Sequence, residues 1–291
     1  MSNLGKPRGL VYCADGVEVA ESLSSESVDL VYLDPPFNTG RRQERETLRT
    51  TRTTEGSGDR KGFGGKAYKT ERLGSRSFGD TFSNYLNFLE PFLVQSQRLL
   101  KPSGSLYLHL DYREAHYAKV LLDQIFGREC FLNEIIWAYD FGGRPKNRWP
   151  AKHDTIFFYG KDPAQNIFNT DEVERIPYMA PGLVGPEKAA RGKLPTDTWW
   201  HTIVSPTGKE KLGYPTQKPL GVLKRIVSAS SPPGGLVVDL VAGSGTTGEA
   251  ALSLGRRFLL VDRSEEAVSV MRTRFLGEPG IEFRGAQIGS D

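Results

Sequence analysis

The last eighty residues of the chain alternate between short apolar runs and amphipathic segments, and this order limits the possible folds more than any other feature. Apolar, β-branched runs predict strands over residues 236–241 and 257–262. Helical spacing predicts helices over residues 218–228, 246–254 and 264–275, the last with Ser264 as its N-cap. Alternation of this kind is typical of α/β proteins, so we expect a parallel sheet covered by helices on both faces.

The preceding part of the chain continues the pattern less regularly. The expected strands are residues 9–13, 28–33, 105–110, 135–139 and 155–159, and the expected helices are residues 84–100 and 113–126. Proline, glycine and charge dominate residues 160–213, where we predict no secondary structure.

Composition excludes several classes of protein. A chain of 291 residues with 38% hydrophobic and 25% charged residues can form one large domain or two small ones. The two cysteines, Cys13 and Cys130, are too far apart in sequence for a zinc ribbon, and two cysteines make no disulfide framework. The four histidines form no HExxH pair, so we expect no metal site. Without an apolar run of about 20 residues or a secretion signal, the protein is expected to be cytoplasmic and to have no membrane contact.

Positive charge is concentrated between Arg41 and Arg76. This segment has eleven basic and five acidic residues and a net charge of +6, which leaves −3 for the rest of a chain whose net charge is +3. Because it has six glycines and little apolar periodicity, we predict a long mobile loop over residues 38–77. Such a loop could be merely solvated, or it could bind the phosphates of a nucleic acid. Arg60, Lys61, Lys66 and Lys69 are the candidates for such phosphate contacts.

A glycine-rich turn follows the predicted strand at residues 236–241. Gly243 and Gly245 would let a ligand approach the backbone closely, and Asp262 ends the next strand, where a carboxylate can accept hydrogen bonds from both ribose hydroxyls. The turn contains no lysine, which excludes a nucleotide-triphosphatase P-loop. The pattern fits an adenosine-type cofactor. It also fits a dinucleotide fingerprint ending at Gly248, or a turn that only packs a helix on a sheet.

A second motif, Asp34-Pro35-Pro36-Phe37, stands directly after the strand predicted at residues 28–33. Two prolines make the turn rigid, so the Asp34 carboxylate and the Pro35 carbonyl point in fixed directions beside an aromatic ring. These groups can accept hydrogen bonds from both hydrogens of a planar amino group and stack on its ring. By itself the motif could be only a turn.

Taken together, these motifs resemble the β group of S-adenosylmethionine-dependent DNA amino-methyltransferases. The resemblance covers most of the chain and depends on five segments in a fixed order. They are Asp34 to Asn38, Leu106 to Trp137, Lys152-His153-Asp154, Tyr214 to Pro219 and Ala242 to Thr247.

The resemblance implies a Rossmann-like methyltransferase sheet with helices on both faces, S-adenosyl-L-methionine as the cofactor, and a catalytic turn made by Asp34, Pro35, Pro36 and Phe37. The residues that it assigns to the cofactor are Asp15, Asp239, Val241, Ala242, Gly243, Ser244, Gly245, Thr246, Asp262, Thr216, Gln217, Lys218 and Pro219. Where the family usually has proline and phenylalanine, this chain has Leu240 and Val241, so we expect a changed affinity for the cofactor.

The resemblance also implies double-stranded DNA as the partner, with the target base flipped out of the helix onto Phe37. An aspartate-led turn favours N6-adenine over N4-cytosine. Residues 1–138 and 214–291 would form the catalytic domain, with residues 37–78 inserted as the basic loop. Residues 139–213 would recognise the target, through Arg144, Lys146 and Arg148. A homodimer and a cognate restriction endonuclease are possible further partners.

Other interpretations stay open at this point. A nicotinamide-dependent oxidoreductase would use the glycine turn but gives the Asp-Pro-Pro-Phe motif no role. A DNA-binding protein with a degenerate cofactor site is a third interpretation, suggested by Leu240 and Val241. His153 and Asp154 would orient local structure or act as acid and base. Methyl transfer requires that the strands before Asp34 and before Gly243 are neighbours, because ligands bind beyond the carboxyl ends of parallel strands.

Overall fold

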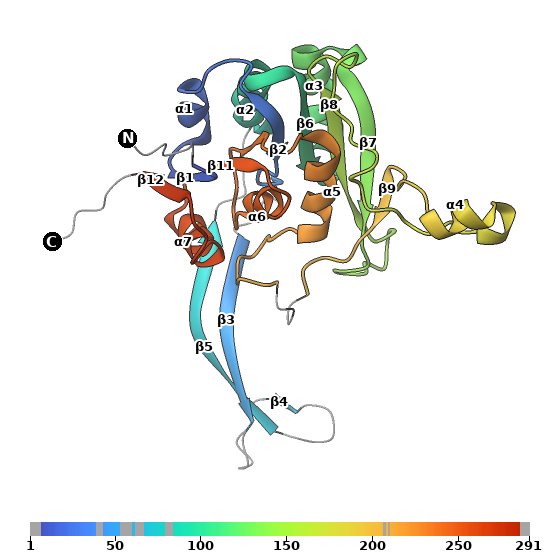
Figure 1. Cartoon of the computed structure of the whole chain (residues 1–291). Coiled ribbons are helices and arrows are strands. Elements are labelled where there is room, and N and C mark those ends of the chain that lie inside the picture. The colour runs from blue at the N-terminus through green and yellow to red at the C-terminus, as the bar shows by residue number, and fades with distance from the viewer. Residues whose placement is uncertain are drawn as a thin grey trace. The chain divides into compact units, whose positions relative to one another are not determined.

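A nine-stranded sheet forms the centre of the larger of two structural units (Figure 1). The computed structural model describes residues 7–38, 43–52, 60–61, 67–78, 84–205, 208 and 210–285. The larger unit comprises residues 1–37 and 84–291, and the smaller unit comprises residues 38–83.

The large sheet has the strand order β12-β1-β11-β10-β2-β6-β8-β7-β9. Its strands are β1 (Gly9–Cys13), β2 (Val28–Leu33), β6 (Leu100–Leu110), β7 (Phe131–Ala138), β8 (His153–Gly160), β9 (Thr198–Trp200), β10 (Leu236–Asp239), β11 (Arg257–Asp262) and β12 (Ile281–Gly285). Strand β8 runs antiparallel to both of its neighbours, and all other pairs of this sheet are parallel. The prediction of a parallel sheet is therefore wrong at β8, because a hydrophobic pattern identifies a strand but not its direction.

Helices cover both faces of this sheet, as predicted. The helices of one face are α1 (Gly16–Glu21), α2 (Tyr85–Leu99) and α3 (Ala115–Phe126), and those of the other are α5 (Leu220–Ser230), α6 (Thr246–Ser253) and α7 (Glu265–Arg274). The second group shares one hydrophobic core with the sheet, whereas α2 contacts both α1 and α3. Ser264 caps α7 by accepting a hydrogen bond from the Ala267 amide, as its sequence position predicts.

Strand β2 lies in the middle of the sheet and all six of its residues are buried. Its sequence therefore has no polar alternation, which is typical of a strand covered on both faces. The buried Asp29 in this strand accepts hydrogen bonds from Lys101 at 2.7 Å and from the Leu236 amide at 2.8 Å. The second bond joins β2 to the start of β10, its parallel neighbour.

The smaller unit contains strands where we predicted a loop. Strands β3 (Gln43–Arg52) and β5 (Ala67–Phe78) pair antiparallel from Gln43–Phe78 to Arg52–Tyr68, and the short β4 (Arg60–Lys61) pairs with the other edge of β5. The prediction is wrong because it depended on apolar alternation, which strands paired through backbone hydrogen bonds do not need. Lys66 lies outside the described residues.

The region predicted to recognise the target, residues 139–213, contributes to the large sheet. Strand β8 lies between β6 and β7, and β9 pairs with β7 at the edge of the sheet. Helix α4 (Pro186–Arg191) and two single 3₁₀ turns, Arg128–Cys130 and Pro181–Leu183, complete the elements of the larger unit. In the part of the chain that the structure describes, no helix has the length and apolar character needed to cross a membrane.

Candidate active site

The two sequence motifs meet at the carboxyl ends of neighbouring strands. Strands β2 and β10 are parallel neighbours, with Leu30 opposite Val237 and Val31 opposite Val238. Strand β2 ends at Leu33, directly before Asp34, and β10 ends at Asp239, four residues before Gly243. The predicted adjacency of these strands is confirmed, and both turns lie at the same edge of the sheet.

The Asp34 carboxylate has different surroundings at its two oxygens. Lys218, directly before the N-cap of α5, forms an ion pair with Oδ2. Oδ1 is buried and has no hydrogen-bond partner among the described residues, and His109 Nδ1 lies 3.6 Å from it. The Phe37 ring lies 4.9 Å from Lys218 Nζ and 5.5 Å from the His109 ring. The turn thus presents one acceptor oxygen beside an aromatic ring.

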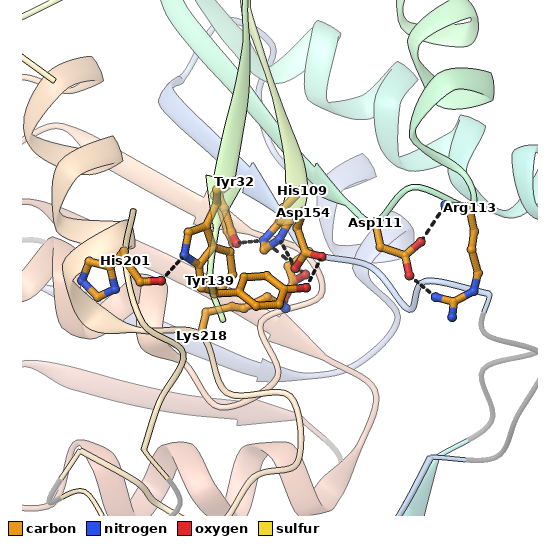
Figure 2. A network of polar contacts seen from close by, with 10 residues as sticks. Tyr32, His109, Asp111, Arg113, Tyr139, Asp154, His201 and Lys218 are labelled. Atoms are coloured by element: carbon orange, nitrogen blue, oxygen red, sulfur yellow. Dashed lines mark hydrogen bonds and ion pairs between the residues drawn. The ribbon is translucent and has the colours of Figure 1, made fainter. Parts of the chain in front are cut away.

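A buried polar network centred on His109 includes Tyr32, Tyr139 and Asp154 (Figure 2). His109, on β6, is fully buried, and its Nδ1 lies 2.8 Å from the Tyr32 hydroxyl. Its Nε2 lies 3.1 Å from Asp154 Oδ2 at the start of β8, and Tyr139 donates to Asp154 Oδ1 at 2.9 Å. Burial acts to raise the pKa of Asp154, but the hydrogen bond and charge of His109 outweigh it and lower that pKa. Asp154 is therefore a carboxylate that accepts from both neighbours.

The glycine turn is held by backbone and side-chain hydrogen bonds. The Gly243 amide donates to Asp262 Oδ2 at 2.8 Å, and the Ala242 amide donates to the Val261 carbonyl at 2.9 Å. Gly245 has φ +76°, a left-handed conformation that favours glycine, and a Cβ there would lie 2.8 Å from Met271 Cγ. Arg274 donates to the Ser244 carbonyl at 2.6 Å, which fixes the turn to α7.

Three carboxyl groups, those of Asp34, Asp239 and Asp262, lie at this edge of the sheet, and two of them act on the third. Burial raises the pKa of Asp239 to about 7, even though the Thr247 hydroxyl and the Val241 amide donate to its carboxylate. The charges of Asp34 and Asp262 raise this pKa further. Burial also raises the pKa of Asp262, whose second oxygen accepts from the Ser264 amide at 2.8 Å. A cationic ligand would reduce this mutual repulsion.

S-adenosylmethionine fits this set of groups. Its sulfonium and ammonium charges are complementary to carboxylates gathered at one edge, and Asp262 stands at the end of β11, where a ribose can be held. Gly243 has no side chain, and a Cβ there would lie 3.1 Å from Tyr214 Cε1, so glycine keeps the space between the turn and that ring. Asp262, Gly243 and the turn up to Thr246 would hold the cofactor, which supplies the methyl group.

Some residues expected at the cofactor have structural contacts in this protein. Asp15 caps α1 by accepting hydrogen bonds from the Val17 and Glu18 amides. The Gln217 side chain bridges the Glu210 carbonyl and the Leu212 amide, which closes the loop before α5. Thr216 is exposed, and Pro219 is the N-cap residue of α5. Their roles toward a cofactor stay predictions.

The basic residues predicted to contact DNA lie in both units. Arg144, Lys146 and Arg148 are exposed in residues 140–152, between β7 and β8. Lys152 closes this loop by donating to the carbonyls of Phe141 at 2.7 Å and Gly142 at 2.9 Å. Because β8 runs antiparallel to β6, the loop lies at the carboxyl edge of β6, on the side of the sheet where Asp154 meets His109. Arg60 and Lys61 form β4, and Lys69 lies in β5 of the smaller unit.

His109, Tyr32 and Tyr139 were not predicted as site residues. The available signal was a histidine near the end of a strand otherwise formed by apolar residues, SLYLHL. Its partner Asp154 is 45 residues away along the chain, and only the antiparallel pairing of β6 with β8 brings the two together.

A Rossmann-like sheet with a glycine turn beside an Asp-Pro-Pro-Phe turn defines a methyltransferase that acts on amino groups. The profile of the N6/N4 DNA methylase family matches residues 28–273, and the chain belongs to this family. It is thus a DNA methyltransferase with S-adenosylmethionine as its cofactor, and solved structures of this fold include complexes with that cofactor. This membership resolves the choice that the glycine pattern left open and excludes the oxidoreductase interpretation.

Similar proteins include two curated bacterial relatives and a solved structure. Type II methyltransferase M.HpaI from Haemophilus parainfluenzae is 27% identical over 91% of this chain and 74% of its own length. DNA adenine methyltransferase YhdJ from Escherichia coli K12 is 26% identical over 92% of this chain and 83% of its own length. The cytosine-N4-specific PvuII DNA methyltransferase has a TM-score of 0.63 and 18% identity, covering 95% of this chain and 91% of its own.

Proposed function

We propose that this enzyme methylates the N6 amino group of an adenine that is flipped out of double-stranded DNA, with N4 of cytosine as the alternative target. The observation that carries the proposal is the buried Asp34 Oδ1, which lacks a hydrogen-bond partner among the described residues. The Phe37 ring, from the same turn, lies 5.5 Å from the ring of His109, whose Nδ1 is 3.6 Å from this oxygen. An acceptor kept without a partner is costly in a folded protein, and a substrate N–H group would satisfy it. The similarity to an adenine methyltransferase supports adenine.

The lone pair of an exocyclic amino nitrogen is delocalised into the base, which makes the nitrogen a poor nucleophile. Asp34 Oδ1 and the Pro35 carbonyl would accept its two hydrogens and hold the nitrogen in the geometry for attack. Phe37 would stack on the extruded base, and Lys218 fixes the carboxylate from its other side. The protein thus contributes position and electrostatics to a transfer whose reactive group belongs to the cofactor.

The DNA would lie across the carboxyl edge of the sheet. Arg144, Lys146 and Arg148 would contact phosphates or guanine edges, and Arg60, Lys61, Lys66 and Lys69 would add phosphate contacts. Function as a homodimer, action beside a cognate restriction endonuclease and a cytoplasmic location are further parts of this proposal. A similar type II methyltransferase supports the second of these.

Mass spectrometry of nucleosides tests the proposal directly. Unmethylated genomic DNA is incubated with the full chain and S-adenosylmethionine, digested to nucleosides and compared with the same reaction of Asp34→Ala. We expect N6-methyl-2′-deoxyadenosine from the unmodified protein and none from the variant. Formation of N4-methylcytosine alone would replace adenine by the alternative, and DNA without any new methylated nucleoside would contradict the proposal.

A further inference from the structure

The side chain of His109 lies between two carboxylates with no exposure to solvent. Its Nδ1 is 3.6 Å from Asp34 Oδ1. Its Nε2 is 3.1 Å from Asp154 Oδ2, and Figure 2 shows this pair. The Phe37 ring at 5.5 Å and the Trp137 ring at 5.4 Å cover the imidazole. A polar group buried in this way, with one nitrogen 3.6 Å from the proposed catalytic carboxylate, calls for a chemical explanation.

The hydrogen bonds determine which nitrogen of His109 is basic. An ionised Asp154 can only accept, so Nε2 carries the hydrogen that it donates to Oδ2. The Tyr32 hydroxyl, 2.8 Å from Nδ1, then donates to that nitrogen. Burial, followed by the charges of Asp34, Asp239 and Asp154, raises the pKa of Tyr32 well above its usual value, so Tyr32 keeps its proton. Nδ1 is therefore an unprotonated, basic nitrogen that faces Asp34.

We infer that His109 takes up, through Asp34, the proton that the target amino group loses on methylation, with Asp154 holding the imidazole in the receptive tautomer. The inference rests on the proposed function and deepens it, because methylation of an amino group leaves one proton too many on the product. His109 acts through Asp34 and is a positioning residue that also stores a proton. The arrangement follows the same logic as other pairs of a carboxylate and a histidine that accept protons during catalysis.

The step balances in atoms and charge. A nitrogen–carbon bond forms as the sulfur–carbon bond breaks with its electron pair on sulfur, and the base gains one positive charge. An N–H bond of the base then breaks, its electron pair stays on nitrogen, and the proton passes to Asp34 Oδ1 and on to His109 Nδ1. The Tyr32 hydroxyl turns its own hydrogen away from Nδ1 in this step, so that its oxygen can accept from the new N–H group. Asp34 and Asp154 carry two negative charges against the single positive charge of Lys218. An imidazolium between them brings the cluster to neutrality, which favours the uptake.

Every element around His109 contributes a group to its environment. Strand β2 and the turn after it contribute Tyr32, Asp34 and Phe37. Strand β7 contributes Trp137, the residue directly after it is Tyr139, and strand β8 contributes Asp154. Lys218 acts on the other oxygen of Asp34.

Single-turnover kinetics of the full chain test the inference. The rate of methyl transfer to unmethylated genomic DNA is measured from pH 5.5 to 9 for the unmodified protein, His109→Gln and His116→Asn. Glutamine keeps an amide donor for Asp154 but cannot take up a proton, and His116 is exposed on α3 and serves as the matched control. Affinity for S-adenosylmethionine is measured on the same samples by calorimetry.

We expect the unmodified protein and the control to share a profile in which the rate rises with pH along an acidic limb. His109→Gln should be slower by about 100-fold or more, without that limb and with unchanged cofactor affinity. A His109→Gln rate within about fivefold of the unmodified rate, with the same pH profile, would overturn the inference. The proposed function would fail in a different way, because the unmodified protein itself would then transfer no methyl group.

Nitrogen-15 NMR spectroscopy of labelled histidine gives a second readout, which uses the unmodified protein and so does not depend on whether a variant folds. A fully buried imidazole exchanges its N–H slowly, which identifies the His109 resonances. In the free protein at pH 8 we expect a neutral ring with its hydrogen on Nε2. A hydrogen on Nδ1, or a doubly protonated ring, would contradict the inference.

Discussion

Replacement of Asp239 by asparagine should change how the stability of the protein depends on pH. The Asp239 carboxyl is fully buried at the end of β10, and burial raises its pKa from 3.8 to about 7. Asparagine can keep both hydrogen bonds, because its oxygen can accept from the Val241 amide and its nitrogen can donate to the Thr247 hydroxyl. The substitution therefore removes a titration with little change in packing.

The sign and size follow from proton linkage. Between pH 4 and pH 7 the unfolded chain has released the Asp239 proton while the folded chain still holds it, so the free energy of unfolding falls as pH rises. The two pKa values differ by about three, and each unit corresponds to about 1.4 kcal/mol, which gives a loss of about 4 kcal/mol by pH 8. Asp239→Asn should not show this loss.

Urea denaturation at pH 5, 6, 7 and 8 measures the effect. We expect the free energy of unfolding of Asp239→Asn minus that of the unmodified protein to increase by about 3 kcal/mol from pH 5 to pH 8, since part of the loss has already occurred by pH 5. Asp171→Asn is the matched control, because the Asp171 side chain is 89% exposed, and its difference should stay nearly constant. If the difference for Asp239→Asn were also independent of pH, the argument from burial would be refuted.

Three further variants test the turn, the ion pair and the basic segment. In urea titrations, Gly245→Ala should lower the free energy of unfolding by about 1–3 kcal/mol more than the control Gly234→Ala. Both glycines have a positive φ, but only a Cβ at Gly245 would meet Met271. Equal losses of stability would contradict this packing. Lys218→Gln should slow single-turnover methyl transfer about 10-fold to 100-fold, since a hydrogen bond to a charged group is worth about 1.5–3 kcal/mol. Lys188→Gln, at an exposed position of α4, is the control. Equal rates for the two variants would show that Lys218 has no role in methyl transfer. Charge reversal at four residues of the basic segment should reduce the salt dependence of DNA binding by about 0.9 for each phosphate that the protein no longer neutralises, and an unchanged slope would exclude a role in DNA binding. The four residues are Arg60, Lys61, Lys66 and Lys69.

The sequence was most informative about the groups at the carboxyl ends of the predicted strands. Strand β2 ends in the Asp34 turn and β10 ends in the glycine turn, and the prediction that these strands are neighbours is confirmed. Such predictions succeed because parallel strands place their carboxyl ends at one edge, whatever the lengths of the connections between them.

Contacts that depend on strand direction, or on pairing between residues far apart in the sequence, could not be predicted in this way. No residue pattern indicates that β8 runs antiparallel to β6, and without that direction Asp154 cannot be placed on His109. The hairpin of β3 and β5 was missed for a related reason, because its residues show no apolar face. The ion pair of Lys218 with Asp34 joins residues 184 positions apart, and the sequence did not predict it either.

A crystal structure of the full chain with a non-reactive analogue of S-adenosylmethionine tests the central claim most directly. The analogue carries an amine at the position of the transferable methyl group. We predict that it lies along the Gly243 turn with its ribose on Asp262 and that this amine faces the Asp34 carboxylate. An analogue bound elsewhere, or one whose amine points away from Asp34, would contradict the proposal that these two turns form one site for methyl transfer.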